Sequence, residues 1–332
     1  MRICVVGAGA IGGLYAAHLA RLDDVEVWAY DVSAAHVAAI ARDGLRLTGR
    51  AQFTARLEAR TDAREIPPCE FGIVATKTTV TEPAIAATAH VFADGAVCSV
   101  QNGIGSEEVI ARHVPRVMRG VCLPAGRVVG PGVVHMDAGG PTWIGPFEDR
   151  PAGMEEVERL ADALDRAGMP AHAEADARGA QWTKLLFNAA TNPLAALTGL
   201  THGELCDIPE LRATASALVA EGRAVADALG ITLDGDPDEL ITRAAAENHD
   251  HRPSMLQDAL AHRPTEIDAL NGGIVRAGAA AGVPTPLHAT ITALITGLEA
   301  GWRRPSPTAS CTSPRRGCST ATSQRRSPTP TG

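Results

Sequence analysis

The feature that most constrains this chain is a glycine-rich turn near the N-terminus, GAGAIG, in which Gly7, Gly9 and Gly12 fit the pattern G-x-G-x-x-G. The turn follows an apolar run at residues 2–6 and opens a stretch of helical character. In a βαβ unit the first glycine permits the tight turn, the second lets the backbone approach a pyrophosphate, and the third lets helix and strand pack closely. This context predicts a dinucleotide-binding turn that includes Ala10 and Ile11.

An acidic residue, Asp31, ends the second candidate strand, where such a fold places the adenosine ribose. A carboxylate there accepts hydrogen bonds from the ribose hydroxyls and repels a 2′-phosphate, so Asp31 favours NAD over NADP. The alternative is an acid that only ends the strand, because acidic residues are common in such loops.

The first part of the chain alternates short β-branched runs with alanine-rich helical stretches, which is typical of a parallel α/β sheet. Residues 126–145 contain further strand-like pieces and are expected to add antiparallel strands. A helix at 154–168 and a strand near 170–173 complete this part. The other expected strands are 2–6, 25–30, 71–76, 96–100 and 117–123, with helical stretches at 12–21, 33–42 and 106–112.

The second part lacks strand signals and is broken into helical segments by proline and glycine. We therefore predict a Rossmann-type domain with a parallel sheet at 1–172 and an all-helical domain at 173–302. Residues 303–332 form a Ser-, Pro- and Arg-rich tail that should be disordered, and no function is assigned to it. The expected helices are 177–198, 208–229, 237–247, 254–261, 264–282 and 287–300.

The composition excludes several classes of function. The net charge of −8 argues against a nucleic-acid or membrane-surface binder, because both need a basic face. The seven cysteines are scattered and form no C-x-x-C pair, so we expect reduced thiols and no metal site. The N-terminal apolar run is broken by glycines and lacks a basic leader, so we expect no targeting segment and a cytoplasmic location.

The segment QWTKLLFNAATNP carries Lys184, Asn188 and Asn192 four residues apart, so all three lie on one face of a helix. A lysine facing a cleft can polarise a ketone and then donate a proton, and two amides can hold a substrate without adding charge. The alternative is a solvent-exposed face. The apolar neighbours of these residues favour a site lining, and Pro193 is expected to kink the helix.

Two further groups of polar residues could complete such a site. Lys77 and Asn102 follow candidate strands, at the edge where an open α/β sheet binds its ligands. Ser254 precedes an expected helix, with Asp258 further on, and Glu266 opens the next one. A hydroxyl and an acid near a lysine would form a pocket for a 2-oxo acid, although Glu266 could simply favour a helix start.

Several motifs, in this order along the chain, resemble the ketopantoate reductase (2-dehydropantoate 2-reductase) family over roughly residues 1–300. A single glycine motif would not be specific, but this series of separated motifs is. The matching pieces are GAGAIG at 7–12, Lys77, QNG at 101–103, W-x-K-L-x-x-N at 182–188, NPL at 192–194, GEL at 203–205, SMLQD at 254–258 and RPTEID at 263–268.

The resemblance implies a cleft between a Rossmann domain and a helical domain, in which nicotinamide hydride reduces a 2-oxo acid to a D-type 2-hydroxy acid. It implies that Lys184 is the general acid and that Glu266 orients substrate and cofactor. It also implies a substrate contact at His202, where the family often has asparagine. The other implied contacts are Asn188, Asn192 and Ser254 for substrate, and Lys77, Asn102 and the backbone around Gly126 for the cofactor.

The leading hypothesis is therefore NAD(P)H-dependent reduction of a small branched 2-oxo acid, with 2-dehydropantoate as the first guess. The family usually prefers NADPH and has an arginine near the end of the second strand, whereas Tyr30-Asp31-Val32-Ser33 contains no basic residue. The alternatives are an NAD-linked D-2-hydroxyacid dehydrogenase of the same family and a dinucleotide-binding sensor without catalysis. A proton donor at Lys184 disfavours the sensor. A homodimer through the helical domain stays open.

Overall fold

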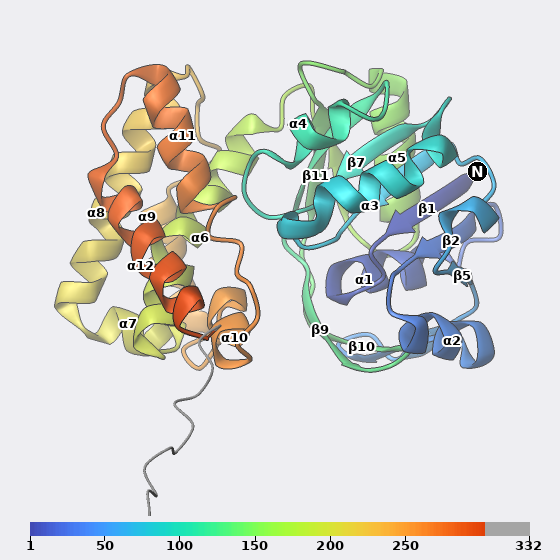
Figure 1. Ribbon diagram of the computed structural model, residues 1–332, viewed down its shortest axis with the longest axis horizontal. Coiled ribbons are helices and arrows are strands. Elements are labelled where there is room, and N and C mark those ends of the chain that lie inside the picture. The colour runs from blue at the N-terminus through green and yellow to red at the C-terminus, as the bar shows by residue number, and fades with distance from the viewer. Residues whose placement is uncertain (303–332) are drawn as a thin grey trace, which may run out of the picture.

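The computed structural model describes residues 1–302, which form two lobes side by side (Figure 1). The N-terminal lobe is built on an eight-stranded sheet with the order β12-β11-β8-β7-β6-β1-β2-β5. Its neighbouring strands are parallel except β8 and β11. The strands are β1 (Arg2–Val6), β2 (Glu26–Tyr30), β5 (Glu58–Arg60), β6 (Phe71–Val74), β7 (Ala96–Ser99), β8 (Val117–Cys122), β11 (Thr142–Pro146) and β12 (Ala171–Ala173).

Strand β1 is apolar and buried on both faces after Arg2, as expected for a parallel sheet covered by helices. Ile3 and Val5 belong to one hydrophobic core, and Cys4 and Val6 belong to a second core on the other face. Helices α1 and α5 contribute to the first core, and α3 and α4 to the second. The helices are α1 (Ala10–Leu19), α2 (Ala34–Asp43), α3 (Thr81–Thr88), α4 (Ser106–Ala111) and α5 (Met154–Arg166), with 3-10 turns η1 (Ala63–Glu65), η2 (Thr78–Val80) and η3 (Ala89–Phe92).

A second sheet of four strands corrects the expectation for residues 126–145. Strands β9 (Ala125–Gly130) and β10 (Val133–Ala138) are antiparallel to each other, as expected, but they lie outside the main sheet. Strand β10 pairs with β3 (Leu45–Gly49), and β3 pairs with β4 (Phe53–Ala55). Only β11 joins the main sheet. Strands β3, β4 and β5 were not predicted, because they are only three to five residues long, too short for a periodic pattern to stand out.

The C-terminal lobe is entirely helical over the residues that the structure describes, which confirms the predicted fold class. Helix α6 is its central element and packs against the helices around it. Pro193 lies inside α6, and the helix continues beyond it to Thr198. The helices are α6 (Arg178–Thr198), α7 (His202–Asp207), α8 (Pro209–Ala228), α9 (Pro237–Glu247), α10 (Ser254–Leu260), α11 (Asn271–Ala281) and α12 (Pro286–Trp302).

The helix predicted at 264–282 is wrong over its first seven residues, since α11 begins only at Asn271. The backbone N–H and the hydroxyl of Thr265 both donate to the Glu299 carboxylate, at 2.9 and 2.6 Å. These bonds, together with a wide turn that joins the Gly272 N–H to the Ile267 carbonyl, replace the first helical turns. Glu266 therefore lies in a turn instead of opening a helix.

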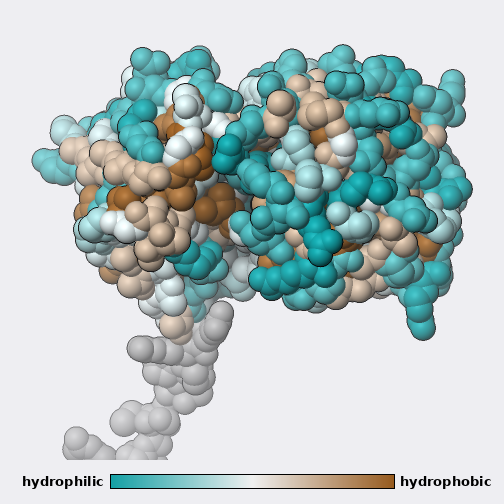
Figure 2. All heavy atoms as spheres, turned by 90° about the horizontal axis from the view of Figure 1, so that it is seen from above, coloured by the Kyte–Doolittle hydropathy of each residue, from teal (hydrophilic) through white to brown (hydrophobic). Residues whose placement is uncertain are grey.

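The surfaces of the two lobes differ. Viewed from above, hydrophobic residues gather on the helical lobe, whereas the sheet lobe is mostly hydrophilic (Figure 2). Even so, no helix within residues 1–302 combines the length and the apolar character needed to cross a bilayer. The predicted disorder of the 303–332 tail lies outside the described residues.

Candidate functional site

The three motif glycines at the start of α1 differ in the space around them, and only Gly9 is open. Gly7 has a φ of +90°, and a Cβ on Gly12 would lie 1.9 Å from the Gly7 carbonyl oxygen, so both glycines are required by the protein itself. A Cβ on Gly9 would meet nothing within 4 Å. Open space at Gly9 and an α1 N-terminus without a side-chain cap leave the amides of Ala10 and Ile11 free for an anion. These residues fit a dinucleotide pyrophosphate.

The peptide groups on either side of Ala8, inside the turn, are held by two side chains. Its N–H donates to Asp31 Oδ2 at 3.0 Å, and its carbonyl accepts from His36 Nε2 at 2.9 Å. Nδ1 of His36 accepts from the N–H of Gly132 in the β9–β10 turn at 3.0 Å. His36 is therefore a neutral imidazole with its proton on Nε2, because both bonds require that form. Asp31 therefore does more than end the strand, since its carboxylate holds the glycine turn in place.

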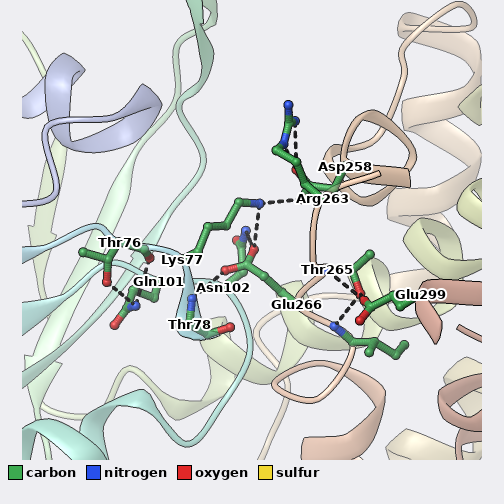
Figure 3. A network of polar contacts seen from close by, with 11 residues as sticks. Thr76, Lys77, Thr78, Gln101, Asn102, Asp258, Arg263, Thr265, Glu266 and Glu299 are labelled. Atoms are coloured by element: carbon green, nitrogen blue, oxygen red, sulfur yellow. Dashed lines mark hydrogen bonds and ion pairs between the residues drawn. The ribbon is translucent and has the colours of Figure 1, made fainter. Parts of the chain in front are cut away.

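A cross-domain cluster joins the carboxyl ends of β6 and β7 to the turn before α11 (Figure 3). The Lys77 amine pairs with Asp258 at 2.7 Å and with Glu266 at 3.5 Å. Glu266 also accepts from the backbone N–H of Thr78 at 3.1 Å and from the side-chain amide of Asn102 at 3.3 Å. Three of the predicted site residues, Lys77, Asn102 and Glu266, thus meet although they come from different lobes.

Electrostatics in this cluster favour the ion pairs. Burial lowers the pKa of the Lys77 amine, but the nearby Glu266 and Asp258 carboxylates outweigh burial, so its pKa lies above its ordinary value. Asp258 is itself buried and accepts two further hydrogen bonds from the Arg263 guanidinium, at 3.0 and 2.9 Å. Lys77 is therefore a fixed ammonium at the sheet edge.

Lys184 reaches from the helical lobe to the sheet lobe. Its amine donates to the carbonyl of Cys122, the last residue of β8, at 2.6 Å. One and two turns further along α6, Asn188 is half-buried and Asn192 is buried. Lys184 thus lies at the same carboxyl edge of the sheet as Lys77 and Asn102, which is where open α/β sheets bind their ligands.

Two other predicted residues lie at the borders of this region. Ser254 is exposed and is the first residue of α10, not the residue before it. Gly126 lies in β9, where a Cβ would stand 2.6 Å from the His135 carbonyl oxygen. That close approach accounts for Gly126 through packing between β9 and β10.

His202 is buried against aromatic rings rather than placed at a charged surface. Only 3% of the residue is exposed, and its ring lies 5.2 Å from the ring of Phe187 and 5.9 Å from that of His251. Burial, with a smaller contribution from His251, lowers the pKa of His202 to about 4. Its Nε2 has no hydrogen-bond partner among residues 1–302. His202 is therefore neutral near pH 7.

Comparison with known proteins decides the family. Residues 3–149 match the family described as ketopantoate reductase PanE/ApbA, and residues 176–299 match its C-terminal counterpart. The 2-dehydropantoate 2-reductase of Pyrococcus abyssi is 32% identical over 302 residues, which cover 90% of this chain and 98% of that protein. The chain belongs to the ketopantoate reductase family. It is accordingly an NAD(P)-dependent oxidoreductase.

Solved structures share the reductase fold across both lobes. A PanE/ApbA family ketopantoate reductase from Ralstonia eutropha superposes with a TM-score of 0.82 at 31% identity, covering 92% of this chain and all of that one. A D-mandelate dehydrogenase in complex with NADH and anilino(oxo)acetate gives a TM-score of 0.82 at 27% identity, covering 91% of this chain and 99% of that one. Proteins with different named substrates therefore share this architecture.

Two residues that hold parts of the candidate site in place were not predicted from the sequence. His36 lies on α2 and carries no motif, so nothing in the sequence indicates that it bridges Ala8 and Gly132. Glu299 acts through the backbone and hydroxyl of Thr265, from a helix that is distant in sequence. Asp258 had a partial signal, because it stands in the matching piece SMLQD, but its pairing with Lys77 depends on the packing of the two lobes.

Proposed function

We propose that this reductase converts a small 2-oxo acid into the corresponding 2-hydroxy acid, with Lys184 as the proton donor. The observation that carries the proposal is the position of the Lys184 amine, 2.6 Å from the carbonyl at the end of β8. From there it faces the same sheet edge as the glycine turn and Asn102. A ketone between the lobes could meet the amine while its carbonyl carbon faces the nicotinamide.

The use of lysine in this chain supports the proposal. Of its 30 lysine and arginine residues only two, Lys77 and Lys184, are lysines, and both lie at the junction of the lobes. Every other basic side chain of the lysine and arginine type in the sequence is an arginine. An amine can give up a proton near neutral pH when its surroundings allow it, whereas a guanidinium cannot. The side chain at position 184 is thus of the kind that can transfer a proton, which an arginine there could not do.

The chemistry balances with these groups. When bound, the nicotinamide supplies a hydride to the carbonyl carbon. The Lys184 ammonium donates a hydrogen bond to the ketone oxygen, which stabilises the negative charge that develops there, and then transfers its proton to that oxygen. The carbonyl becomes a CH–OH group, and the resulting neutral amine regains a proton from water. Exclusion of water by the closed lobes strengthens this electrostatic effect.

The remaining side chains are proposed to hold and orient the substrate. Asn188 and Asn192 follow Lys184 along the same face of α6 and can bind the carboxylate and the side chain of the acid. The Ser254 hydroxyl, at the start of α10, can form a further hydrogen bond with the acid. Glu266, fixed by Asn102 and Thr78, is placed to orient the substrate and the cofactor. 2-Dehydropantoate is the first candidate substrate, because the curated relatives carry that name.

A second candidate substrate is an aromatic 2-oxo acid, as for the similar D-mandelate dehydrogenase. The half-buried ring of Phe187, next to Asn188 on α6 and backed by the ring of His202, favours it, because aromatic rings pack well against one another. In that case the reaction is an NAD-linked D-2-hydroxyacid dehydrogenase reaction on the same residues.

We also propose that NADH is preferred to NADPH. The Asp31 carboxylate stands at the end of β2 and would repel a 2′-phosphate. Arg60 on β5 lies opposite Tyr30, the last residue of β2. Its guanidinium is already paired with Glu58 at 2.9 Å and with Glu65 at 3.1 Å. Arg60 is therefore poorly placed to hold a phosphate in place of these acids.

The test measures oxidation of NADH and of NADPH, separately, with 2-dehydropantoate, an aromatic 2-oxo acid and a panel of branched ones. The proposal predicts turnover with at least one 2-oxo acid and faster turnover with NADH. If dinucleotide binds but no 2-oxo acid is reduced, the chain is the dinucleotide sensor considered above, and the proposal is wrong.

A further inference from the structure

A buried polar cluster lies beside the Lys184 site and is not explained by cofactor or substrate binding. It joins Glu107 of α4, Arg119 of β8 and Gln181 of α6, which are 3, 6 and 7% exposed. Ionisable side chains are rarely buried to this extent unless they are paired. Two of these residues belong to the sheet lobe and the third belongs to the helical lobe, so the cluster spans the junction.

The contacts of the cluster run from one lobe to the other. The side-chain amide of Gln181 donates to Glu107 Oε1 at 2.9 Å and to the Gly103 carbonyl at 3.3 Å. The guanidinium of Arg119 binds both oxygens of Glu148, at 2.9 and 2.8 Å. Its Nε lies 3.9 Å from Glu107 Oε1, close enough for attraction without a hydrogen bond.

The cluster fixes the same two elements that place the proton donor. Gln181 and Lys184 are three residues apart on α6, so they lie on neighbouring turns of one face. Arg119 and Cys122 are three residues apart on β8. The Lys184 amine bonds to Cys122, and Gln181 bonds to Glu107, which faces Arg119. Helix α6 is thus linked to β8 directly through Lys184, and indirectly through Gln181 and Glu107 of α4, whose carboxylate attracts Arg119.

We propose that Glu107 and Gln181 are positioning residues, which hold α6 against β8 so that the Lys184 amine stays at the ketone site. The proposal rests on the proposed role of Lys184 as proton donor. It assigns no contact with substrate or cofactor to either residue. Loss of the cluster should therefore lower kcat, while the KM for the dinucleotide, which is bound by the glycine turn, stays unchanged.

The ionisation of Glu107 supports this assignment. Burial raises its pKa to about 7, although the charge of Arg119 opposes that rise. The other groups that face it are Glu108 on the same helix, which raises its pKa further, Gln181 on α6, and the thiol of Cys98 on β7. Above about pH 7 the carboxylate attracts Arg119 and binds the Gln181 amide, whereas below it the attraction to Arg119 is lost.

The first experiment compares wild type with Glu107→Gln, which has nearly the shape of the protonated acid but never ionises. We expect kcat of wild type to exceed that of the variant about fivefold at about pH 8 and to match it at about pH 6, where both side chains are neutral. The matched control is Glu108→Gln, the exposed neighbour on α4, whose kcat should match that of wild type at about pH 8, where Glu107 is ionised in both proteins. A ratio of wild type to Glu107→Gln that does not change with pH would overturn the proposal.

The second experiment does not require activity. Because the chain has only two lysines, an amine-selective acylating reagent and peptide mass spectrometry can report Lys184 with Lys77 as the internal reference. Gln181→Met removes both hydrogen bonds of the amide, and the Lys184-to-Lys77 labelling ratio should then rise severalfold. An unchanged ratio in folded Gln181→Met would overturn the proposal. If that variant does not fold, the same ratio in Glu107→Gln at about pH 8 decides in its place.

The two proposals fail differently. Wild type that reduces no 2-oxo acid contradicts the proposed function, and the labelling ratio still tests the placement of Lys184. Wild type that is active, and in which Lys184→Ala is inactive, leaves the proposed function intact. If Glu107→Gln and Gln181→Met then match wild type in kcat, pH profile and labelling, only the positioning role is wrong.

Discussion

The two halves of the site are built in different ways. At the glycine turn the proposed ligand-facing groups are backbone amides, and the turn itself is held at Ala8 by Asp31 and His36, which lie within 28 positions of it. At the junction of the lobes the groups are side chains, and the pairs Lys77–Asp258 and Thr78–Glu266 join positions 181 and 188 residues apart. The turn is therefore held by contacts between nearby positions, whereas the proposed reacting groups depend on how the two lobes are packed.

The largest expected effect comes from replacing the proton donor at the junction. Lys184→Ala, and equally Lys184→Arg, should lower kcat by about 10² or more, because a guanidinium keeps the charge but does not release a proton. Dinucleotide binding, measured by quenching or enhancement of nicotinamide fluorescence, should survive. Steady-state kinetics with the best 2-oxo acid gives the comparison.

The other lysine provides the matched control. Lys77→Arg keeps a cation beside Asp258 and Glu266, so its kcat should fall much less than that of Lys184→Arg. Normal turnover by Lys184→Arg would show that position 184 supplies only charge, and a larger loss in Lys77→Arg would exchange the roles of the two lysines.

The next effect distinguishes two glycines of the turn. Gly9→Ala should weaken dinucleotide binding about tenfold or more without loss of stability, because its methyl group would occupy the space left for the pyrophosphate. Gly12→Ala should instead lower the free energy of unfolding by about 1–3 kcal/mol, because the methyl group would collide with the Gly7 carbonyl. Titration calorimetry and denaturant unfolding of both variants measure this contrast. Equal behaviour of the two variants would contradict the assignment of Gly9 to the ligand.

A smaller effect is expected at Asp31, where charge and turn geometry can be separated. Asp31→Asn keeps an oxygen that can accept from the Ala8 N–H but removes the charge. The ratio of kcat/KM with NADPH to that with NADH should rise about tenfold, because repulsion of the 2′-phosphate is lost. Should the ratio stay the same while the variant remains folded, Asp31 serves only to hold the turn.

The smallest effect is a pH dependence of stability from His202. Its pKa is about 4 in the folded protein and 6.5 ordinarily, so the unfolded chain binds more protons as pH falls below 6.5. Folding should lose about 1 kcal/mol between about pH 6.5 and 5.5 from this residue alone. Urea unfolding of wild type and His202→Asn over this range measures the difference. Parallel stability curves would mean that His202 is not buried in neutral form.

The same contrast explains what the sequence could predict. The glycine turn and the main parallel strands follow from local patterns, namely glycine spacing and continuous apolar runs. The line of Lys184, Asn188 and Asn192 follows from helical period. These features need only neighbouring residues. The pairing of β3 with β10 was missed because it joins distant segments, and no local pattern reports it. Strand β4, which pairs with β3, was missed because it is only three residues long.

The side-chain network at the junction shows the limit more clearly. The sequence pattern predicted that Glu266 opens a helix. In the structure the carboxylate of Glu299 instead holds Thr265 in a turn, so that Glu266 can accept from the backbone N–H of Thr78. Likewise, nothing in the sequence distinguishes Arg119 and Glu107 from exposed charged residues, although both are buried in the folded protein. Such roles depend on tertiary contacts, which a single sequence does not encode in any short pattern.

The most direct test of the account is a crystal structure with NADH and an unreactive 2-oxo-acid analogue bound. The account predicts the Lys184 amine within about 3 Å of the keto oxygen, with the nicotinamide ring on the other side of the carbonyl. An amine that points to solvent in the closed complex, or that stays on the Cys122 carbonyl away from the ligand, would contradict it.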